Sequence, residues 1–405
     1  MKRIAVITMH AVKNYGSVLQ TYATQRIIQI KGCDPVIIDF RRPWDTGITY
    51  YLDVKNKKMK DILKQIIYLP TKIKQNKIFG FFLKKYILLT EHTYHKKDDF
   101  KLYPCEADIY CTGSDQVWNS GWNRGIIEEF FLTFVSDEKK KVSYAASIGK
   151  SNLEENEKVR IAKYLASYDA ISVRESSSIS ILNDIGIHNA SMVLDPTLQL
   201  PQNEWRKIIQ KDTRKIDNYV LIIQLNRNKK FDDFALEFAR SHKKKLVRLC
   251  LRLDQAVLPG KPILIPQVVD YLSCIDNADY ILTDSFHAVS FSLNFEKNFY
   301  CILPDKYSSR LESILTDLDL QDRIIKNYMQ TWTTYAVELT AGEHTITWTY
   351  QKDSSVDKEG DYANVDNVYV GAPVVPTSIE APDFTAGQKS FMNGWLCLEK
   401  VSSFM

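Results

Sequence analysis

The sequence predicts an α/β protein built on open parallel sheets, and two features near the N-terminus indicate this fold class. Residues 3–9 and 35–40 are mostly apolar and are predicted to be parallel strands buried on both faces. Between them, apolar residues recur at helical spacing from Val18 to Ile30, and Gly32 ends the predicted helix. The resulting βαβ unit places its first loop at the sheet edge where α/β proteins bind ligands.

Further strand-like runs follow along the chain, and most of them end in a loop that carries polar groups or glycine. The expected strands are residues 107–112, 141–146, 170–173, 192–194, 219–225, 246–251 and 280–282. A helix from about Phe286 to Asn294 is expected directly after the last of these strands. Because the carboxyl ends of parallel strands meet at one edge of a sheet, these loops predict a ligand cleft there.

The bulk composition limits the class of protein. The chain has 405 residues, of which 45% are hydrophobic and 25% are charged, and this is the balance of a soluble globular enzyme with more than one domain. A net charge of +4 is too small to indicate nucleic-acid binding. No apolar run is long enough for a signal peptide or a membrane span, so we expect a cytoplasmic protein.

The cysteines and short motifs argue against a metal or redox cofactor. The seven cysteines are irregularly spaced and form no C-x-x-C pair, which favours reduced and mostly buried thiols. No metal-ligand motif, P-loop or G-x-G-x-x-G fingerprint occurs. We therefore expect no metal and no cofactor.

Residues 51–100 form a lysine-rich segment that we expect to be a helical insertion in an N-terminal domain. Its lysines interleave with apolar residues, most clearly between Ile62 and Leu69. One interpretation is a solvated insertion. The other is a surface that rests on anionic lipid at the inner face of the membrane, near a lipid-linked acceptor.

The character of the sequence changes after about residue 328. Apolar and polar residues alternate over 335–339 and 344–350, which predicts an antiparallel hairpin, and residues 364–370 predict another strand. This extension resembles the last strands of a secreted carbohydrate-binding or adhesin-like β-sandwich. The resemblance is carried by Trp332, Tyr335, Gly342, Trp348, Tyr350 and Asp366. It covers only part of such a domain, so we expect residues 328–405 to be foreign to the rest of the chain or incomplete.

Seven short motifs in the first part of the chain together resemble the polysaccharide pyruvyl transferase family. They are Asn14-Tyr15-Gly16-Ser17-Val18-Leu19-Gln20, Gly113-Ser114-Asp115-Gln116-Val117-Trp118-Asn119, Tyr144-Ala145-Ala146-Ser147-Ile148-Gly149, Ser172-Val173-Arg174-Glu175, Asp195-Pro196-Thr197, Thr283-Asp284-Ser285-Phe286-His287 and Ser308-Ser309-Arg310. Each is weak alone, but their common order makes the resemblance specific. It implies transfer of a pyruvyl group from phosphoenolpyruvate to a sugar of an exopolysaccharide or cell-wall precursor, usually as a cyclic ketal.

The same resemblance implies two Rossmann-like domains that face each other, as in the two-domain glycosyltransferases called GT-B, and the strand pattern agrees with it. We expect an N-terminal domain over residues 1–168, a second domain over 169–327 and the antiparallel β extension over 328–405. The chain departs from the family pattern in places. Ser285 stands where many members have arginine, and Ala288 stands where glycine is frequent. The closing C-terminal helix of the family is not evident after about residue 325.

Phosphoenolpyruvate carries a phosphate and a carboxylate, and arginine binds such groups better than lysine does. Arg174 and Arg310 are the candidate donor ligands at motif positions. The alternative for each is a structural ion pair.

Ketal formation moves protons, so it calls for a side chain that can accept and return one near neutral pH. His287 lies at a predicted strand end, just inside a helix and beside Asp284 and Ser285. With the family motif, His287 is the candidate catalytic residue. Asp284 is the second catalytic candidate, because it could orient the histidine or shape the loop, and Ser285 is a candidate substrate contact.

Two loops are expected to contact substrate. In the first, Asn14, Tyr15, Gly16 and Gln20 lie where a ligand would meet the first helix. In the second, the candidate sugar contacts are Ser114, Asp115, Gln116 and Trp118. The alternative for the second loop is a helix cap at Ser114 or Asp115 with a buried tryptophan.

Three functions remain open from the sequence. The first is pyruvyl transfer from phosphoenolpyruvate. The second is a glycosyltransferase that uses a nucleotide-sugar donor on the same two-domain plan, because fold does not determine function. The third is a non-catalytic carbohydrate-binding protein, to which the β-rich extension points.

Overall fold

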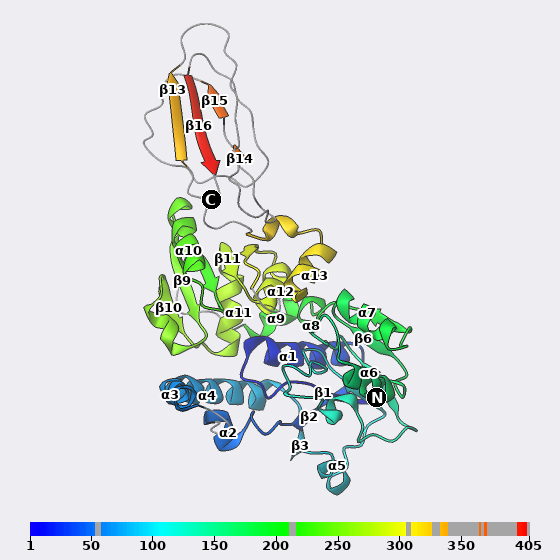
Figure 1. The fold of residues 1–405 in the computed structure, drawn as a ribbon. Coiled ribbons are helices and arrows are strands. Elements are labelled where there is room, and N and C mark those ends of the chain that lie inside the picture. Colours follow the sequence, from blue (N-terminus) through cyan, green and yellow to red (C-terminus); the bar gives the residue numbers. More distant parts are fainter. Residues whose placement is uncertain are drawn as a thin grey trace. The chain divides into compact units, whose positions relative to one another are not determined.

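The structure is a computed structural model, and it consists of two compact units (Figure 1). The described parts are residues 1–52, 58–209, 216–304 and 309–325, together with the strands at 333–338, 364–365, 368–370 and 395–402. One unit comprises residues 1–228 and 245–325, and the other comprises 229–244 and 326–405. The first unit contains both parallel sheets and the candidate site.

The first sheet is parallel and has the strand order β3-β2-β1-β4-β5. Its strands are β1 (Arg3–Ile7), β2 (Asp34–Phe40), β3 (Leu89–Tyr94), β4 (Ile109–Thr112) and β5 (Lys140–Ser143). The order reverses direction between β1 and β4, and such a reversal opens a ligand crevice at the carboxyl ends of the two strands.

Two short strands, β6 (Ile171–Val173) and β7 (Ala190–Met192), continue this first sheet beyond β5. The Ser143 amide donates to the Ala170 carbonyl, and the Ala146 amide donates to the Ser172 carbonyl. From the sequence, these strands are expected in a second domain that starts at residue 169. The hydrogen bonds place them with the N-terminal sheet instead.

The second sheet is also parallel, with the order β10-β9-β8-β11-β12. Its strands are β8 (Tyr219–Ile223), β9 (Lys245–Cys250), β10 (Lys261–Leu264), β11 (Tyr280–Thr283) and β12 (Asn298–Cys301). This order repeats that of the first five strands, so the expected pair of Rossmann-like sheets is confirmed.

The helices connect these strands along the chain. They are α1 (Tyr15–Ile30), α2 (Gly47–Tyr51), α3 (Met59–Ile67), α4 (Leu69–Tyr86), α5 (Asp99–Leu102), α6 (Glu155–Leu165), α7 (Ser176–Asp184), α8 (Pro196–Gln199), α9 (Gln202–Ile208), α10 (Lys229–Ser241), α11 (Val268–Asp276), α12 (Phe286–Asn294) and α13 (Ser309–Asp317), with 3-10 turns at Glu128–Phe131, Leu253–Val257 and Gln321–Arg323. The helix predicted from about Phe286 to Asn294 is confirmed as α12.

Helix α1 lies between the two sheets and shares one hydrophobic core with both of them (Figure 1). Its residues 15–25 are all buried. The Tyr15 ring stacks on that of Tyr271 at 4.4 Å, and the Tyr22 and Trp205 ring centroids lie 5.5 Å apart. A helix that is buried all round joins the two halves and holds their strand ends opposite each other.

The prediction that residues 51–100 form a helical insertion is wrong in part. Residues 89–94 form β3, which pairs with β2 in the first sheet. Helix α4 is the crossover between these two strands, and it buries Phe79 and Phe82 in the shared core, where Phe82 packs against Tyr22. The segment is therefore part of the sheet architecture. Residues 53–57 lie outside the described part.

In the second unit, the described strands form an antiparallel sheet around β16 (Trp395–Ser402), which pairs with β13 (Thr333–Glu338), β14 (Asn364–Val365) and β15 (Val368–Val370). The second strand of the predicted hairpin, residues 344–350, lies outside the described residues. Of the residues that carry the resemblance to a secreted β-sandwich, only Tyr335 falls in a described strand. That resemblance remains an expectation.

The described residues contain neither a candidate membrane-spanning helix nor a candidate metal cluster. No helix there combines the length and the apolar character that crossing a bilayer requires. No cluster of three or more His, Cys, Asp or Glu side chains there could hold a metal ion.

Candidate functional site

A cleft of about 560 Å³ opens between the two sheets, at the carboxyl ends of their strands. Its described lining consists of Val12, Asn14, Ser17, Asp115, Gln116, Trp122, Leu225, Asn226, Asp284, Ser285, Phe286, His287, Pro304 and Leu311. The loops after β1 and β4 contribute one wall, and those after β8 and β11 contribute the other. The cleft therefore uses the topological switch point of both sheets at once.

The start of α1 forms the floor of the cleft. The Asn14 side chain caps the helix by accepting a hydrogen bond from the Gly16 amide at 2.8 Å. Gly16 lies directly beneath the imidazole of His287, because a Cβ added at Gly16 would come within 2.1 Å of His287 Nδ1. Only a residue without a side chain allows this approach, so the motif glycine determines where the histidine ring can sit.

His287 occupies the first turn of α12, and its side chain is mostly buried but lines the cleft. Ser285 caps this helix by accepting from the Ala288 amide at 3.4 Å. The helix thus begins at the strand end of β11, and its first turn brings the imidazole back over α1. The N-termini of α1 and α12 both face the cleft, and helix N-termini favour anions.

Asp284 shapes the opposite wall. Its carboxylate accepts hydrogen bonds from the Leu225 amide at 2.6 Å and from the Asn226 amide at 2.8 Å. Burial raises the pKa of Asp284, and the hydrogen bonds from Leu225 and Asn226 oppose that rise. Of the two roles that the sequence left open for Asp284, these contacts favour shaping the loop, because they tie the end of β11 to the end of β8.

Arg174 lies in a fully buried ionic network behind the cleft wall. Its guanidinium donates to Asp195 at 2.7 Å and to Glu175 at 3.2 Å, and it lies 3.5 Å from Asp115. Burial lowers the pKa of the guanidinium, but the three carboxylates outweigh this effect and raise it above its ordinary value. The side chain has no exposed surface. The structural ion pair, which the sequence left open as the alternative for Arg174, is what these contacts show.

Asp195 links this network to the histidine. Burial raises the pKa of its carboxyl, but the charge of Arg174, the charge interaction with His287 and the hydrogen bonds from Thr197 together outweigh burial and lower the pKa to about 2. Its Oδ2 accepts a hydrogen bond from Arg174, and its Oδ1 accepts hydrogen bonds from the Thr197 amide and hydroxyl. A charge on the imidazole is therefore attracted by a carboxylate that stays ionised at neutral pH.

Asp115 carries the network into the cleft. Its backbone is left-handed, with φ of 76°, a conformation that aspartate adopts more readily than most residues. One carboxylate oxygen accepts from the Ser17 hydroxyl at 2.5 Å, and the other accepts from the Gln116 amide at 2.9 Å. Asp115 therefore joins the loop after β4 to helix α1 at the floor of the cleft.

Three residues expected to contact substrate point into the core instead. The Tyr15 hydroxyl donates to the Pro266 carbonyl, and Gln20 donates to Thr8 at 2.9 Å. Trp118 is almost wholly buried, donates to the Phe130 carbonyl and stacks on Phe131. The second loop was expected to supply either sugar contacts or a helix cap with a buried tryptophan, and Trp118 is the buried tryptophan of the second alternative.

Two other candidate substrate contacts, Ser114 and Arg310, are not among the described residues that line the cleft. Ser114 is buried behind the wall and donates to Asp195 at 3.1 Å. Arg310 belongs to the first turn of α13, one residue before Leu311, which lines the cleft. Its side chain lies outside the described part of the structure.

Sequence reasoning missed several residues of the cleft, most notably Trp122. Its side chain is 53% exposed and lines the cleft, whereas Trp118 in the same loop is 1% exposed. The sequence offers no signal that separates the two tryptophans, because both stand in the same loop. Asp195 and Ser17 were also missed, although both lie within quoted motifs.

The charge around the cleft is unusual for a site that would hold an anionic donor. Among the described lining residues there is no lysine or arginine, and the two carboxylates are those of Asp115 and Asp284. Both already accept hydrogen bonds from the protein. The anion-binding capacity of the described lining therefore rests on the two helix N-termini and the imidazole.

The two parallel Rossmann-like sheets, with the cleft at their paired switch points, define an α/β protein of the GT-B-like fold class. The chain belongs to the polysaccharide pyruvyl transferase family, because the model of that family matches residues 14–306. The protein is accordingly a transferase. The match spans every described residue that lines the cleft except Val12 and Leu311.

Comparison with solved structures returns low overall similarity. UDP-GlcNAc 2-epimerase from Neisseria meningitidis is 11% identical, with a TM-score of 0.43 over 80% of this chain and 86% of that chain. UDP-GlcNAc 2-epimerase from Methanocaldococcus jannaschii is 13% identical, with a TM-score of 0.44 over 78% and 86%. An α-glucosyltransferase in complex with UDP and DNA is 9% identical, with a TM-score of 0.42 over 80% and 81%. None of these values bears on the reaction. No curated protein matches the sequence.

Proposed function

We propose that the protein transfers a pyruvyl group from phosphoenolpyruvate to two hydroxyls of a sugar in an exopolysaccharide or cell-wall precursor and forms a ketal. Membership of the family supports the transfer, and the site supports the chemistry. The observation that carries the proposal is the imidazole of His287, which lies over Gly16 between two helix N-termini in the cleft.

The reaction needs proton transfer but no oxidant or reductant. An acceptor hydroxyl oxygen bonds to the central carbon of phosphoenolpyruvate, the methylene carbon takes up one proton and becomes methyl, and the bond from the central carbon to the phosphate oxygen breaks. The second hydroxyl completes the ketal. Of the two hydroxyl protons, one balances the new methyl group and the other leaves with phosphate.

An imidazole can accept and return a proton near neutral pH, so His287 is the proposed catalytic residue. It would take the proton of the attacking hydroxyl or pass one to the methylene carbon. Asp195 would stabilise the protonated ring through its charge, as its own lowered pKa indicates. In this proposal Asp284 acts on the loops that flank the histidine, through Leu225 and Asn226.

The described lining of the cleft has no lysine or arginine, so we assign the donor by position. The N-termini of α1 and α12 would receive its phosphate or carboxylate, with Ser285 at the second of these ends. Arg310 remains the proposed arginine ligand, because Leu311 beside it lines the cleft. Arg174 is proposed only as a positioning residue, since its donors already bind three carboxylates.

The acceptor would lie against the wall after β4. Gln116 and Asn14 offer amide groups to sugar hydroxyls, and Trp122 offers an exposed indole face for a sugar ring. We place the reaction in the cytoplasm, with no metal or redox cofactor.

The test is phosphate release from phosphoenolpyruvate with a panel of nitrophenyl and lipid-linked sugars. The proteins compared are the wild type, His287→Ala and the control His188→Ala, which removes an exposed histidine beside Asn183. We expect acceptor-dependent release by the wild type and the control, and at least about 100-fold less by His287→Ala.

The same panel separates the alternatives. Turnover of a UDP-sugar without phosphate release from phosphoenolpyruvate would replace the proposal with glycosyl transfer. Sugar binding that is unchanged in His287→Ala, with no turnover of either donor, would indicate a carbohydrate-binding protein.

A further inference from the structure

Helix α3 leaves most of its apolar face exposed. Met59, Leu63, Ile66 and Ile67 are 79%, 58%, 52% and 65% exposed, and no residue of α3 is buried. Asp61 and Gln65, on the opposite side of the helix, are partly buried. A helix that packs as part of a soluble domain has the opposite arrangement.

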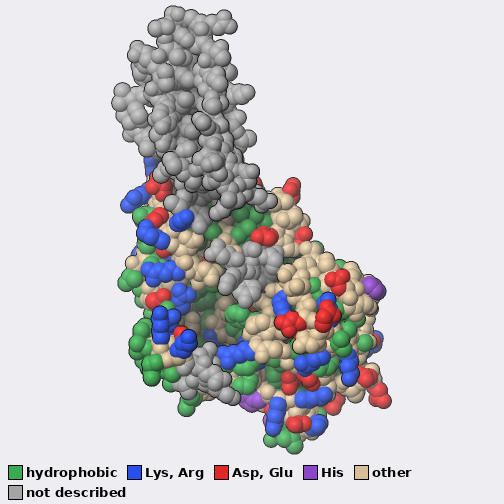
Figure 2. Space-filling model, viewed as in Figure 1, with side chains coloured by type: hydrophobic (Ala, Val, Ile, Leu, Met, Phe, Trp, Pro, Cys, Tyr) green, Lys and Arg blue, Asp and Glu red, His purple; other side chains and the backbone are tan. Residues whose placement is uncertain are grey.

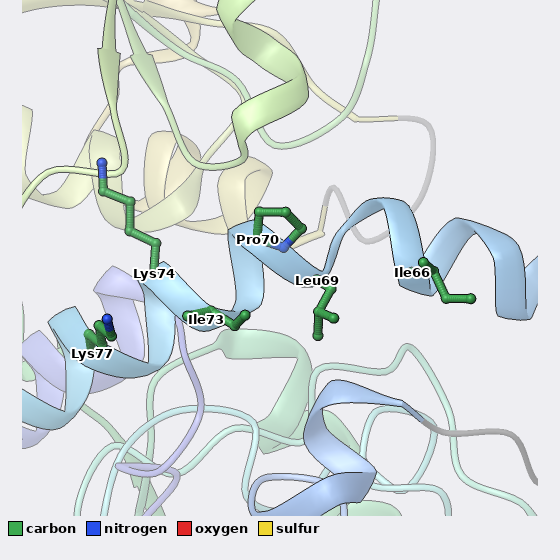
Figure 3. A pocket seen from close by; sticks show the side chains of 6 residues that line it. All are labelled: Ile66, Leu69, Pro70, Ile73, Lys74 and Lys77. Atoms are coloured by element: carbon green, nitrogen blue, oxygen red, sulfur yellow. The ribbon is translucent and has the colours of Figure 1, made fainter.

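The exposed apolar side chains continue from α3 onto α4. Ile66, Leu69, Pro70 and Ile73 line one shallow groove together with Lys74 and Lys77 (Figure 3). Figure 2 shows hydrophobic side chains beside Lys and Arg side chains at the lower left, where α3 and α4 lie in Figure 1. An apolar surface of this kind in a soluble protein indicates something that covers it.

The charge around this apolar surface is strongly positive. Residues 58–86 contain eight lysines and one aspartate. Lys60 and Lys64 are exposed on α3 and flank its apolar face at helical spacing. Apolar side chains flanked by lysines fit the interface of an anionic bilayer, where the apolar groups enter the acyl boundary and the lysines meet lipid headgroups.

This surface adjoins the rim of the cleft. The Leu253 amide donates to the Thr71 hydroxyl of α4 at 3.1 Å, and Arg252 donates to the carbonyl of Leu225, which lines the cleft. Near the other wall, Lys13 lies between the lining residues Val12 and Asn14, and its amino group is 5.3 Å from the centre of the Tyr50 ring. The Tyr50 hydroxyl in turn donates to the Lys72 carbonyl of α4. Residues next to both walls of the cleft are thus connected to α4.

We propose that α3 and the start of α4 dock on an anionic lipid bilayer and hold the cleft against the surface where a lipid-linked acceptor resides. The acceptor part of this inference rests on the proposed function, whereas the docking itself does not. The occupant we commit to is the bilayer.

The test is flotation of the full-length protein with vesicles of phosphatidylcholine alone or of phosphatidylcholine with phosphatidylglycerol. We expect the wild type to float with the anionic vesicles and to be released as salt is raised. Leu63→Ser/Ile66→Ser and Lys60→Glu/Lys64→Glu should each lower the vesicle-bound fraction by about 10-fold or more.

Matched controls make the same changes elsewhere on the surface. Leu102→Ser/Val159→Ser replaces two side chains that are each 71% exposed, and Lys31→Glu/Lys163→Glu reverses two exposed lysines. Both control proteins should float as the wild type does. All variants should keep the wild-type rate on a water-soluble acceptor, because none of the changed residues lines the cleft.

Two results would overturn the docking proposal. One is wild-type protein that floats no better with anionic than with neutral vesicles, or α3 variants that float normally. The other is a wild-type dimer in solution that Leu63→Ser/Ile66→Ser converts to monomer, which would make this face a contact between two copies. Flotation that succeeds while phosphoenolpyruvate is not turned over would count against the proposed function and leave the docking intact.

Discussion

Replacing Gly16 with alanine should move the imidazole of His287, the proposed catalytic group, without unfolding the protein. The new Cβ would lie 2.1 Å from His287 Nδ1 and 2.3 Å from Cγ, whereas ordinary contacts begin at 3.4 Å. Gly16 is in the first turn of α1, where alanine is a favourable helical residue, so the backbone itself tolerates the change. The conflict is therefore confined to the contact with the ring.

The size of the effect follows from that overlap. The ring has to retreat by roughly 1.3 Å, the difference between 3.4 and 2.1 Å, and it can do so because it lines the cleft. A misplacement of about 1 Å in a reacting group can lower the rate by about 100-fold. That loss corresponds to about 2.7 kcal/mol in the activation free energy.

The assay is acceptor-dependent phosphate release, read beside urea denaturation of the same protein. The control is Gly80→Ala in α4, where an added Cβ meets nothing within 4 Å, and it should be as active as the wild type and more stable by up to about 1 kcal/mol. A Gly16→Ala protein with wild-type turnover would refute the role given to the ring. So would a Gly16→Ala protein that loses activity only because it is unfolded.

Two further pairs of substitutions test the assignment of the walls and of the buried network. Trp122→Ala should raise the KM for the acceptor roughly five-fold, from loss of about 1 kcal/mol of ring contact, with little change in stability. Trp118→Ala should instead lower the free energy of unfolding by about 3–5 kcal/mol, and equal effects of the two changes on KM would contradict the placement. Arg174→Met should lower the free energy of unfolding by about 3–5 kcal/mol, measured by urea denaturation, because it leaves buried carboxylates without their partner. The wild type should be more stable than Asp195→Asn, and this difference in unfolding free energy should be complete above pH 3.8. It should shrink by roughly 2 kcal/mol as the pH falls toward 2, because folding lowers the pKa of the Asp195 carboxyl from 3.8 to about 2. A difference in unfolding free energy that does not change with pH would contradict this reasoning.

The central strands could be predicted from the sequence because they are buried on both faces. The runs at 3–9 and 219–225 correspond to β1 and β8, each at the centre of its sheet, and each contains at least four consecutive apolar residues. The strands that were missed, β3, β10 and β12, all lie at the edges of the two five-stranded orders. Edge strands need only one apolar face, so their sequences carry less signal.

The sequence motifs predicted which residues lie near the cleft, but not how their side chains point. They placed His287, Asp284, Asn14 and Gln116 at the cleft, but they could not show which side of a helix each residue occupies. Tyr15 points to the core because α1 is buried all round, a tertiary fact that periodicity does not contain.

The ion pairs of Arg174 could not be predicted from the sequence either, because they join distant parts of the chain. Arg174 contacts Asp115 and Asp195, which are 59 and 21 residues away in sequence. Spacing alone offers no reason to combine them. The sequence therefore identified the charged residue but not the carboxylates that hold it.

The chemistry assigned to the cleft can be followed in the product made in deuterated water. If phosphoenolpyruvate is the donor and its methylene carbon takes a proton from an exchangeable side chain such as His287, the pyruvyl methyl group of the ketal will contain one deuterium, and one phosphate will be released for each ketal formed. His287→Gln should form neither at a measurable rate. A wild-type enzyme that makes no ketal from phosphoenolpyruvate with any acceptor, or a His287→Gln enzyme that makes it at the wild-type rate, would contradict the assignment.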